Sequence, residues 1–274
     1  MRVDEIVERL WPGSEAVVTV LGGGITNHNF KVEVGGEAFV LRIGGKDTEL
    51  LGIDRTHEHA ASMLAASLGV GPEVVAFVEP EGYLVTRFVQ GTPVPPERMP
   101  VAAVGETLRL VHGAGAIPSR FDSFRVVETY REIAEVHGVR VPAAYAEAKQ
   151  RADAIEVRRG PYELCPCHND LLNANFIDDG ERLRIVDWEY AGMGDPFFDL
   201  GNFAVNHELD AAGERALLTA YLGEADETTL ELLREMRFMS DFREAMWGVV
   251  QQGISQLDVD FIAYADEHFA RALA

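Results

Sequence analysis

The alternation of apolar and polar residues in the first third of the chain predicts a short helix followed mainly by strands. Apolar residues recur at helical intervals from Val3 to Leu10, and Pro12-Gly13 ends that pattern. Runs rich in β-branched residues then predict a three-stranded meander, a helix from about Asp54 to Leu68, and two further strands. The expected strands cover residues 16–21, 29–34, 38–43, 73–77 and 82–88.

A stretch rich in glycine and proline at residues 90–96 separates this β-rich part from a mainly helical one. The order of elements predicts an α+β chain with two lobes joined by a short connector. We place the β-rich N-terminal lobe at residues 1–90, the connector at 91–96 and the helical C-terminal lobe at 97–274.

The helical lobe contains one hairpin signal. Strand-like runs at residues 175–177 and 183–187 flank Asp178-Asp179-Gly180-Glu181, where Asp-Gly favours the tight turn that links antiparallel strands. The hairpin brings the residues that enter it close to those that leave it. The expected helices around it cover residues 101–112, 126–156, 198–206, 211–222, 228–252 and 261–273.

The acidic composition limits the possible partners. The 274 residues include 45 acidic and 24 basic side chains, for a net charge of −21, so a phosphate backbone would be repelled and no nucleic-acid partner is expected. No apolar run approaches the roughly 18 residues of a membrane span, and the N-terminus lacks a signal pattern. We therefore expect a cytoplasmic protein without a membrane partner, with Cys165 and Cys167 as reduced thiols.

A polar segment before the hairpin carries the strongest chemical signal. His168, Asp170 and Asn175 have the form H-x-D-x-x-x-x-N, and Asp187 follows at the end of a hydrophobic strand. Phosphoryl transfer needs a carboxylate that accepts the proton of the attacking hydroxyl, and oxygen ligands that hold Mg²⁺ on the nucleotide phosphates. Asp170 suits the first task, Asn175 and Asp187 suit the second, and His168 is expected to brace the loop. A solvated loop would explain any one of these residues, but not the set.

These motifs resemble those of the small-molecule kinases with a protein-kinase-like fold, the group that holds aminoglycoside phosphotransferases and choline/ethanolamine kinases. The choline/ethanolamine kinase branch is the more similar, through Asp54-Arg55 and a C-terminal block around Trp247-Gly248. The resemblance implies a bilobal fold with ATP in the cleft between the lobes, and ATP and Mg²⁺ as cofactors. It also implies that Asp170 is the catalytic base and that Asn175 and Asp187 are the metal ligands.

The resemblance also assigns residues of the N-terminal lobe to the nucleotide. Arg42 falls where protein kinases place a phosphate-holding lysine, and Glu58 on the following helix would be its ion-pair partner. For Arg42 alone, a surface cation at a strand edge is the alternative. The turn over the phosphates would include Gly23, Gly24, Thr26 and Asn27, since glycines allow close backbone approach, although glycines between strands also make ordinary turns.

The acceptor site is expected to involve Glu189, Glu244 and Trp247. An aromatic ring beside carboxylates can receive an organic cation, and the resembling family uses such groups around the amine of its acceptor. Packing between helices is the alternative for Trp247. Val250 stands where the branch often has a second tryptophan, which leaves ethanolamine or another amino alcohol open as the acceptor, besides choline.

Together these residues predict an ATP- and Mg²⁺-dependent kinase that phosphorylates the hydroxyl of a small, cationic amino alcohol. The alternative within the same fold is an aminoglycoside or macrolide phosphotransferase. A third hypothesis is a non-catalytic nucleotide-binding module, against which the intact set of Asp170, Asn175 and Asp187 argues. Neither the natural acceptor nor the oligomeric state follows from the sequence.

Overall fold

An antiparallel sheet forms the N-terminal part of the chain in a computed structural model that describes residues 2–22 and 27–274. Its strand order among these residues is β1-β2-β3-β5-β4, so the expected meander is confirmed and is extended by one hairpin. The strands are β1 (Val17–Leu21), β2 (Asn27–Val34), β3 (Glu37–Gly44), β4 (Val74–Val78) and β5 (Tyr83–Arg87).

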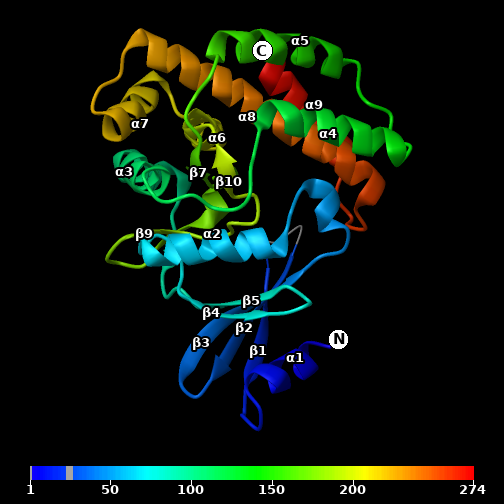
Figure 1. Cartoon of the computed structure of the whole chain (residues 1–274), viewed down its shortest axis with the longest axis vertical. Coiled ribbons are helices and arrows are strands. Elements are labelled where there is room, and N and C mark those ends of the chain that lie inside the picture. The colour runs from blue at the N-terminus through cyan, green and yellow to red at the C-terminus, as the bar shows by residue number, and fades with distance from the viewer. Residues whose placement is uncertain (1, 23–26) are drawn as a thin grey trace.

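Two helices accompany this sheet (Figure 1). Helix α1 (Val3–Leu10) buries Ile6 and Val7 against Val32, Phe39 and Leu41 of the sheet, which forms a small separate core. Helix α2 (Arg55–Ser67) begins at Asp54, whose side chain caps two backbone N–H groups, and lies between the sheet and the helical part of the chain.

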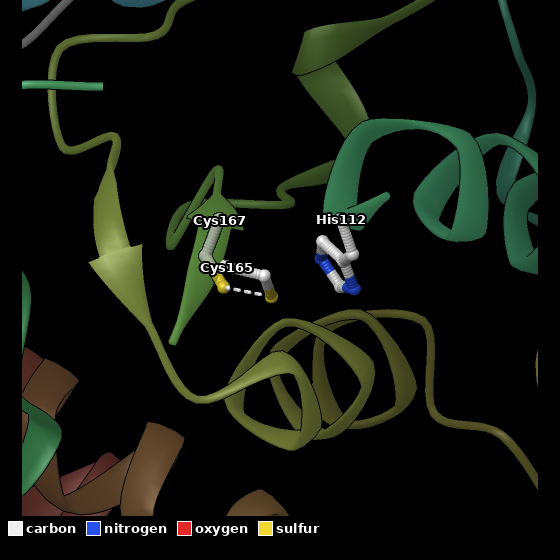
Figure 2. Close-up of side chains that lie close together, drawn as sticks. All are labelled: His112, Cys165 and Cys167. Carbon is white, nitrogen blue, oxygen red and sulfur yellow. Dashed lines mark hydrogen bonds between the residues drawn. The ribbon is translucent and has the colours of Figure 1, made fainter. Parts of the chain in front are cut away.

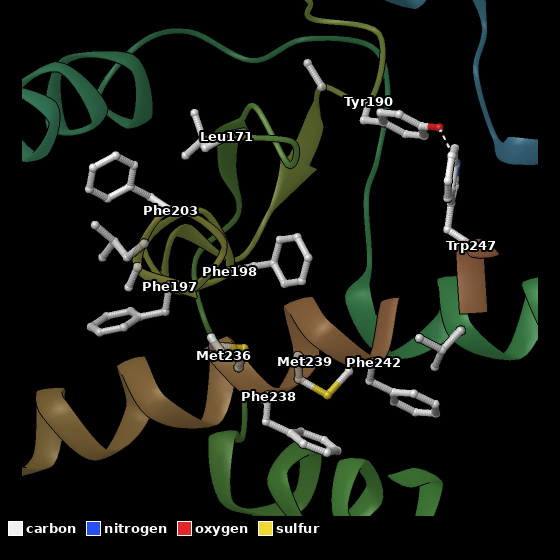
Figure 3. Packing of buried hydrophobic residues seen from close by; sticks show 14 of the residues in the cluster. Leu171, Tyr190, Phe197, Phe198, Phe203, Met236, Phe238, Met239, Phe242 and Trp247 are labelled. Atoms are coloured by element: carbon white, nitrogen blue, oxygen red, sulfur yellow. Dashed lines mark hydrogen bonds between the residues drawn. The ribbon is translucent and has the colours of Figure 1, made fainter. Parts of the chain in front are cut away.

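The helical part is built around α8 (Glu227–Ile254), a long helix whose side chains are almost all buried over its second half. Met236 and Met239 pack toward α6 (Pro196–Asn206), as Figure 3 shows. The two backbones approach closely at Gly201, where a Cβ would lie 2.5 Å from the Met236 carbonyl carbon. The other helices are α3 (Val101–His112), α4 (Ser123–Val136), α5 (Ala144–Arg159), α7 (Ala211–Leu222) and α9 (Phe261–Leu273).

Short strands complete the helical part and carry the loop of interest. The expected hairpin is confirmed as β8 (Phe176–Asp178) and β9 (Leu183–Ile185), and β6 (Thr92–Pro93) pairs with β8. Strand β7 (Cys165–Cys167) pairs with β10 (Gly192–Gly194). The short 3₁₀ helices are η1 (Thr48–Leu51), η2 (Pro96–Arg98) and η3 (Asn173–Asn175).

The single helix expected over residues 126–156 is wrong. The structure has α4 and α5 instead, because Gly138 adopts a left-handed φ of 74° that ends α4, and Pro142 then precedes the start of α5. Within the described ranges, no helix combines the length and the apolar composition of a membrane span. The β-rich and helical halves follow the expected order, while the limits of the lobes at residues 90 and 97 remain predictions.

Candidate active site

Side chains of α6 fix the loop that follows β7. Asp199 accepts hydrogen bonds from the backbone N–H groups of His168 and Asn169, at 2.8 and 2.6 Å, and Asn202 accepts one from Leu171 N at 2.5 Å. Asp199 and Asn202 are fully buried. Asn169 has a left-handed φ of 66°, which a short polar side chain tolerates and which turns the chain toward Asp170. The fold therefore holds the backbone of the loop from one side.

A cluster of His112, Cys165 and Cys167 extends this support (Figure 2). His112 Nε2 lies 3.0 Å from Asp199 Oδ2, its Nδ1 lies 2.8 Å from the Tyr221 hydroxyl, and the two sulfur atoms are 3.7 Å apart. Burial raises the pKa of the Cys167 thiol well above its usual value, so this thiol is protonated at neutral pH. Both ring nitrogens of His112 already have partners, so His112 braces Asp199, and the two thiols lie beside this histidine.

Replacing Asp199 by alanine is expected to lower the free energy of unfolding by roughly 2–5 kcal/mol, because two buried N–H groups lose their acceptor. Turnover should fall as well, since the loop loses its support. The matched control is Asp210→Ala, which removes an exposed cap of α7 and should cost about 1 kcal/mol. Denaturant unfolding of both variants makes the comparison, and equal losses would show that Asp199 is an ordinary cap.

His168 connects the loop to the residues that precede Asp187. Its Nε2 lies 3.0 Å from Val186 O, its Nδ1 accepts from Asp170 N at 3.2 Å, and its ring meets Trp188 edge-on. Burial lowers the pKa of His168, which fits a neutral ring that donates at one nitrogen and accepts at the other. His168 thus touches both the loop and the residue before Asp187, and the bracing role expected for it remains a prediction.

Asp170, Asn175 and Asp187 meet at one place. Asn175 donates from Nδ2 to Asp170 O at 2.8 Å, and Val186 N donates to Asn175 O at 3.0 Å. Since Nδ2 is used as a donor, Asn175 keeps its side-chain oxygen for another partner, and Asp187 adds carboxylate oxygens. Oxygen atoms of this kind suit Mg²⁺, so the donor set fits the ion expected here.

Burial raises the pKa of Asp170 to about 7, and the opposing effect of Arg243 limits the rise. A carboxylate with a pKa near neutrality is both sufficiently ionised and sufficiently basic to take a proton at physiological pH. Arg243 Nη1 lies 3.2 Å from Asp170 Oδ1. The role of Asp170 as a general base remains a prediction.

A pocket of about 400 Å³ lies next to these oxygens, between the sheet and the hairpin. Its polar lining includes Arg42, Asn175 and Asp187, together with Asn29, Glu58, Ser62, Thr86 and Arg87. The rest is mainly apolar and comes from Leu21, Val40, Leu84, Phe88, Val89, Pro93, Ala174, Ile177 and Trp188. A mainly apolar pocket that also exposes a guanidinium and carboxylate oxygens suits a nucleotide.

Ion pairs run from the sheet to the loop after β9. The pair expected between Arg42 and Glu58 is present at 2.7 Å, and Arg42 Nη1 also lies 2.5 Å from Asp187 Oδ1. Arg55 extends this series of ion pairs, because its Nη1 lies 2.7 Å from Glu58 Oε2 and 3.2 Å from Glu189 Oε2. Burial alone would lower the pKa of Arg42, but Asp187 and Glu58 raise it, so the guanidinium stays charged. Arg55 had no role assigned from the sequence, although it lies in a motif singled out there.

The turn expected over the phosphates is described only at its end. Gly23, Gly24 and Thr26 lie outside the described residues. Asn27 is buried at the start of β2, and its Nδ2 donates to Glu189 Oε2 at 2.8 Å. Asn27 thus links the end of the turn to an expected acceptor-binding residue.

Of the three residues expected around the acceptor, Glu244 and Trp247 lie on α8, whereas Glu189 contacts Asn27 and Arg55. Trp247 Nε1 donates to the Tyr190 hydroxyl at 3.1 Å, and the two rings are joined by this bond in Figure 3. Glu244 accepts from the Tyr264 hydroxyl at 2.7 Å and is paired with Arg243. A second pocket, of about 770 Å³, opens beside them, and Tyr130, Glu189 and Tyr190 form part of its wall.

Comparison with known proteins agrees with this architecture. The model of the phosphotransferase enzyme family matches residues 17–238. LicA of Haemophilus influenzae is 26% identical over 217 residues, which span 75% of this chain and 62% of LicA. Ethanolamine kinase 2 of Rattus norvegicus is 28% identical over 265 residues, which span 84% of this chain and 67% of that enzyme.

One solved structure matches over a larger share of both chains than these two relatives do. The choline/ethanolamine kinase family protein from Mesorhizobium loti is 33% identical, with a TM-score of 0.83, and the match covers 100% of this chain and 94% of that one. The likeness confirms the expected protein-kinase-like fold, with its antiparallel sheet followed by a helical part. The family match and this relative show that the chain belongs to the phosphotransferase enzyme family, within its choline/ethanolamine kinase group, and is a small-molecule kinase.

Proposed function

We propose that the protein transfers the γ-phosphoryl group of Mg²⁺-ATP to the hydroxyl of a small amino alcohol. The observation that carries this proposal is the meeting of Asp170, Asn175 and Asp187 beside a pocket that also contains Arg42. Phosphoryl transfer requires a base, oxygen ligands for the metal ion and a cation that can hold phosphates.

The residues divide the reaction between them. The apolar wall of the smaller pocket holds the base and sugar of the nucleotide, and Arg42 binds phosphate oxygens while Glu58 keeps its guanidinium in place. Mg²⁺, held by Asn175 and Asp187, would neutralise the charge of the phosphates. Asp170 orients the acceptor hydroxyl and takes its proton, so the oxygen attacks the γ-phosphorus in line and ADP leaves. No covalent enzyme intermediate is needed.

An amino alcohol is favoured as the acceptor by the acidic and aromatic surroundings of Asp170. Glu189 and Tyr190 line the larger pocket, and Glu244 and Trp247 lie just behind it. Ammonium groups interact well with carboxylates and with aromatic faces. The names of the relatives, which include ethanolamine kinases and a choline/ethanolamine kinase family protein, point to the same class.

Acceptor-dependent ADP release tests this proposal directly. We would supply Mg²⁺-ATP with choline, ethanolamine, other amino alcohols, aminoglycosides and macrolides, and use Asp170→Ala as the blank. We expect saturable phosphorylation of an amino alcohol and no transfer by the blank. Activity on an antibiotic alone would establish the alternative acceptor class, while ATP binding without turnover on any acceptor would favour the non-catalytic module.

A further inference from the structure

Arg243 on α8 is a buried cation at the centre of the acceptor region. It is 1% exposed, its Nη1 lies 3.2 Å from Asp170 Oδ1, and the same nitrogen is bonded to Glu244. The guanidinium carbon lies 4.4 Å from the centre of the Tyr190 ring. The Tyr130 hydroxyl is a further close neighbour of the guanidinium, and no carboxylate or carbonyl oxygen accepts from Nε or Nη2 among residues 2–22 and 27–274. The aromatic face therefore takes the place of hydrogen bonds for part of this cation.

Two neighbours of Arg243, Tyr190 and Glu244, are linked to each other through Trp247 and Tyr264, and we call these four residues the cation cage. Trp247 donates to Tyr190, packs edge-on against Tyr264 with ring centres 5.5 Å apart, and Tyr264 donates to Glu244. Glu244 in turn bonds to Arg243. The guanidinium thus lies on the face of Tyr190 and against Glu244, and Trp247 and Tyr264 connect these two residues on the other side.

Such a cage is what a quaternary ammonium group requires. A trimethylammonium cannot donate an N–H hydrogen bond, so it depends on aromatic faces and on nearby negative charge. Here the guanidinium already covers the face of Tyr190 and forms an ion pair with Glu244. A second cation at the same place would meet Coulomb repulsion in a region that is shielded from water.

A primary ammonium is not subject to the same exclusion. It has three N–H donors and can be held by carboxylate oxygens at the edge of the larger pocket, where Glu189 lies, without entering the cation cage. A quaternary ammonium alcohol therefore needs an aromatic face, whereas a primary amino alcohol needs hydrogen-bond acceptors. Arg243 obstructs only the kind that needs the aromatic face.

We propose that Arg243 determines the acceptor class, by filling the cation cage so that quaternary ammonium alcohols are rejected and primary amino alcohols are accepted. This inference rests on the proposed function, since it concerns the acceptor of the same reaction. It makes Arg243 a specificity-determining residue that also positions the carboxylate of Asp170 through their contact.

Tetramethylammonium chloride tests the cage without any turnover. Calorimetric titration should show no saturable binding to the wild type, and binding at least about tenfold tighter in Arg243→Ala, the scale of a typical cation–π contact. Arg243→Gln is a second variant, because glutamine can still donate to Asp170 or Glu244 and so protects the fold. Arg234→Ala is the matched control, since Arg234 lies on the same helix, half-exposed, and pairs with Glu214.

The kinetic arm compares choline with ethanolamine. The ratio of kcat/KM for choline to that for ethanolamine should rise at least about tenfold in the Arg243 variants and stay at the wild-type value in the control. Saturable binding of tetramethylammonium to the wild type, in competition with ethanolamine, would overturn the proposal without any variant. An unchanged ratio in both folded variants would also overturn it.

The failure of the proposed function would appear differently. In that case the wild type would bind Mg²⁺-ATP but phosphorylate none of the amino alcohols, whereas the titration with tetramethylammonium would still report whether the cage is filled. The phosphorylation assay therefore tests the proposed function, and the titration with tetramethylammonium tests the proposal about Arg243.

Discussion

Replacing Asp170 by asparagine is expected to lower kcat by about 10³-fold, the typical contribution of a general base. Asparagine has nearly the same shape but cannot accept the proton of the acceptor hydroxyl. Binding of Mg²⁺-ATP should stay at the wild-type level, because Arg42, Asn175 and Asp187 are unchanged. Steady-state kinetics with the best acceptor and calorimetric titration with Mg²⁺-ATP measure the two quantities.

The control for this variant is Asp4→Asn, which makes the same chemical change at an exposed position of α1. It should leave both kcat and nucleotide binding unaltered. A kcat for Asp170→Asn within tenfold of the wild type would contradict the role of the base. The variant also loses the charge that faces Arg243, so its folding must be confirmed by thermal unfolding with and without the nucleotide.

The catalytic set could be predicted from the sequence because its members lie close together along the chain. His168, Asp170 and Asn175 share one loop, and the Asp-Gly turn of the hairpin returns the chain to place Asp187 beside them. Only local geometry is needed for this step. The structure brings these residues together as expected, and their catalytic roles remain predictions.

Contacts between segments that lie far apart in the sequence cannot be predicted from local patterns in this way. The support of the loop by Asp199 and the pairing of Arg243 with Asp170 depend on where α6 and α8 cross the loop. No periodicity along the chain contains that information. The pairing of β7 with β10 was missed for another reason, because three-residue strands are too short to show alternation.

Trp247 illustrates how an aromatic residue can satisfy two interpretations. Packing between helices and binding of a cation were both open from the sequence. In the structure Trp247 is buried, packs against Phe261 and Tyr264, and bonds to Tyr190, which belongs to the wall of the larger pocket. Trp247 therefore contributes to the core directly and, through Tyr190, to the wall of the larger pocket.

The position of Arg42 links the nucleotide site to the metal site. The same guanidinium nitrogen, Nη1, donates to both Glu58 and Asp187, so a phosphate that binds Arg42 also approaches the carboxylate proposed to bind the metal. The two carboxylates then have different tasks. Glu58 holds both Arg42 and Arg55, whereas Asp187 holds Arg42 and is the carboxylate that we propose binds Mg²⁺.

Replacing Asp187 by asparagine is expected to lower kcat/KM by roughly 10²–10³-fold, the scale of losing one charged group that stabilises the transferred phosphoryl group. Because a neutral amide binds Mg²⁺ more weakly than a carboxylate, the Mg²⁺ concentration for half-maximal rate should also rise. Glu58→Gln is the matched variant. It removes the other carboxylate from Arg42, so it should raise the KM for ATP and leave the Mg²⁺ dependence as in the wild type. Titrating Mg²⁺ at fixed ATP separates the two, and equal half-saturation in both variants would mean that Asp187 acts through Arg42 alone.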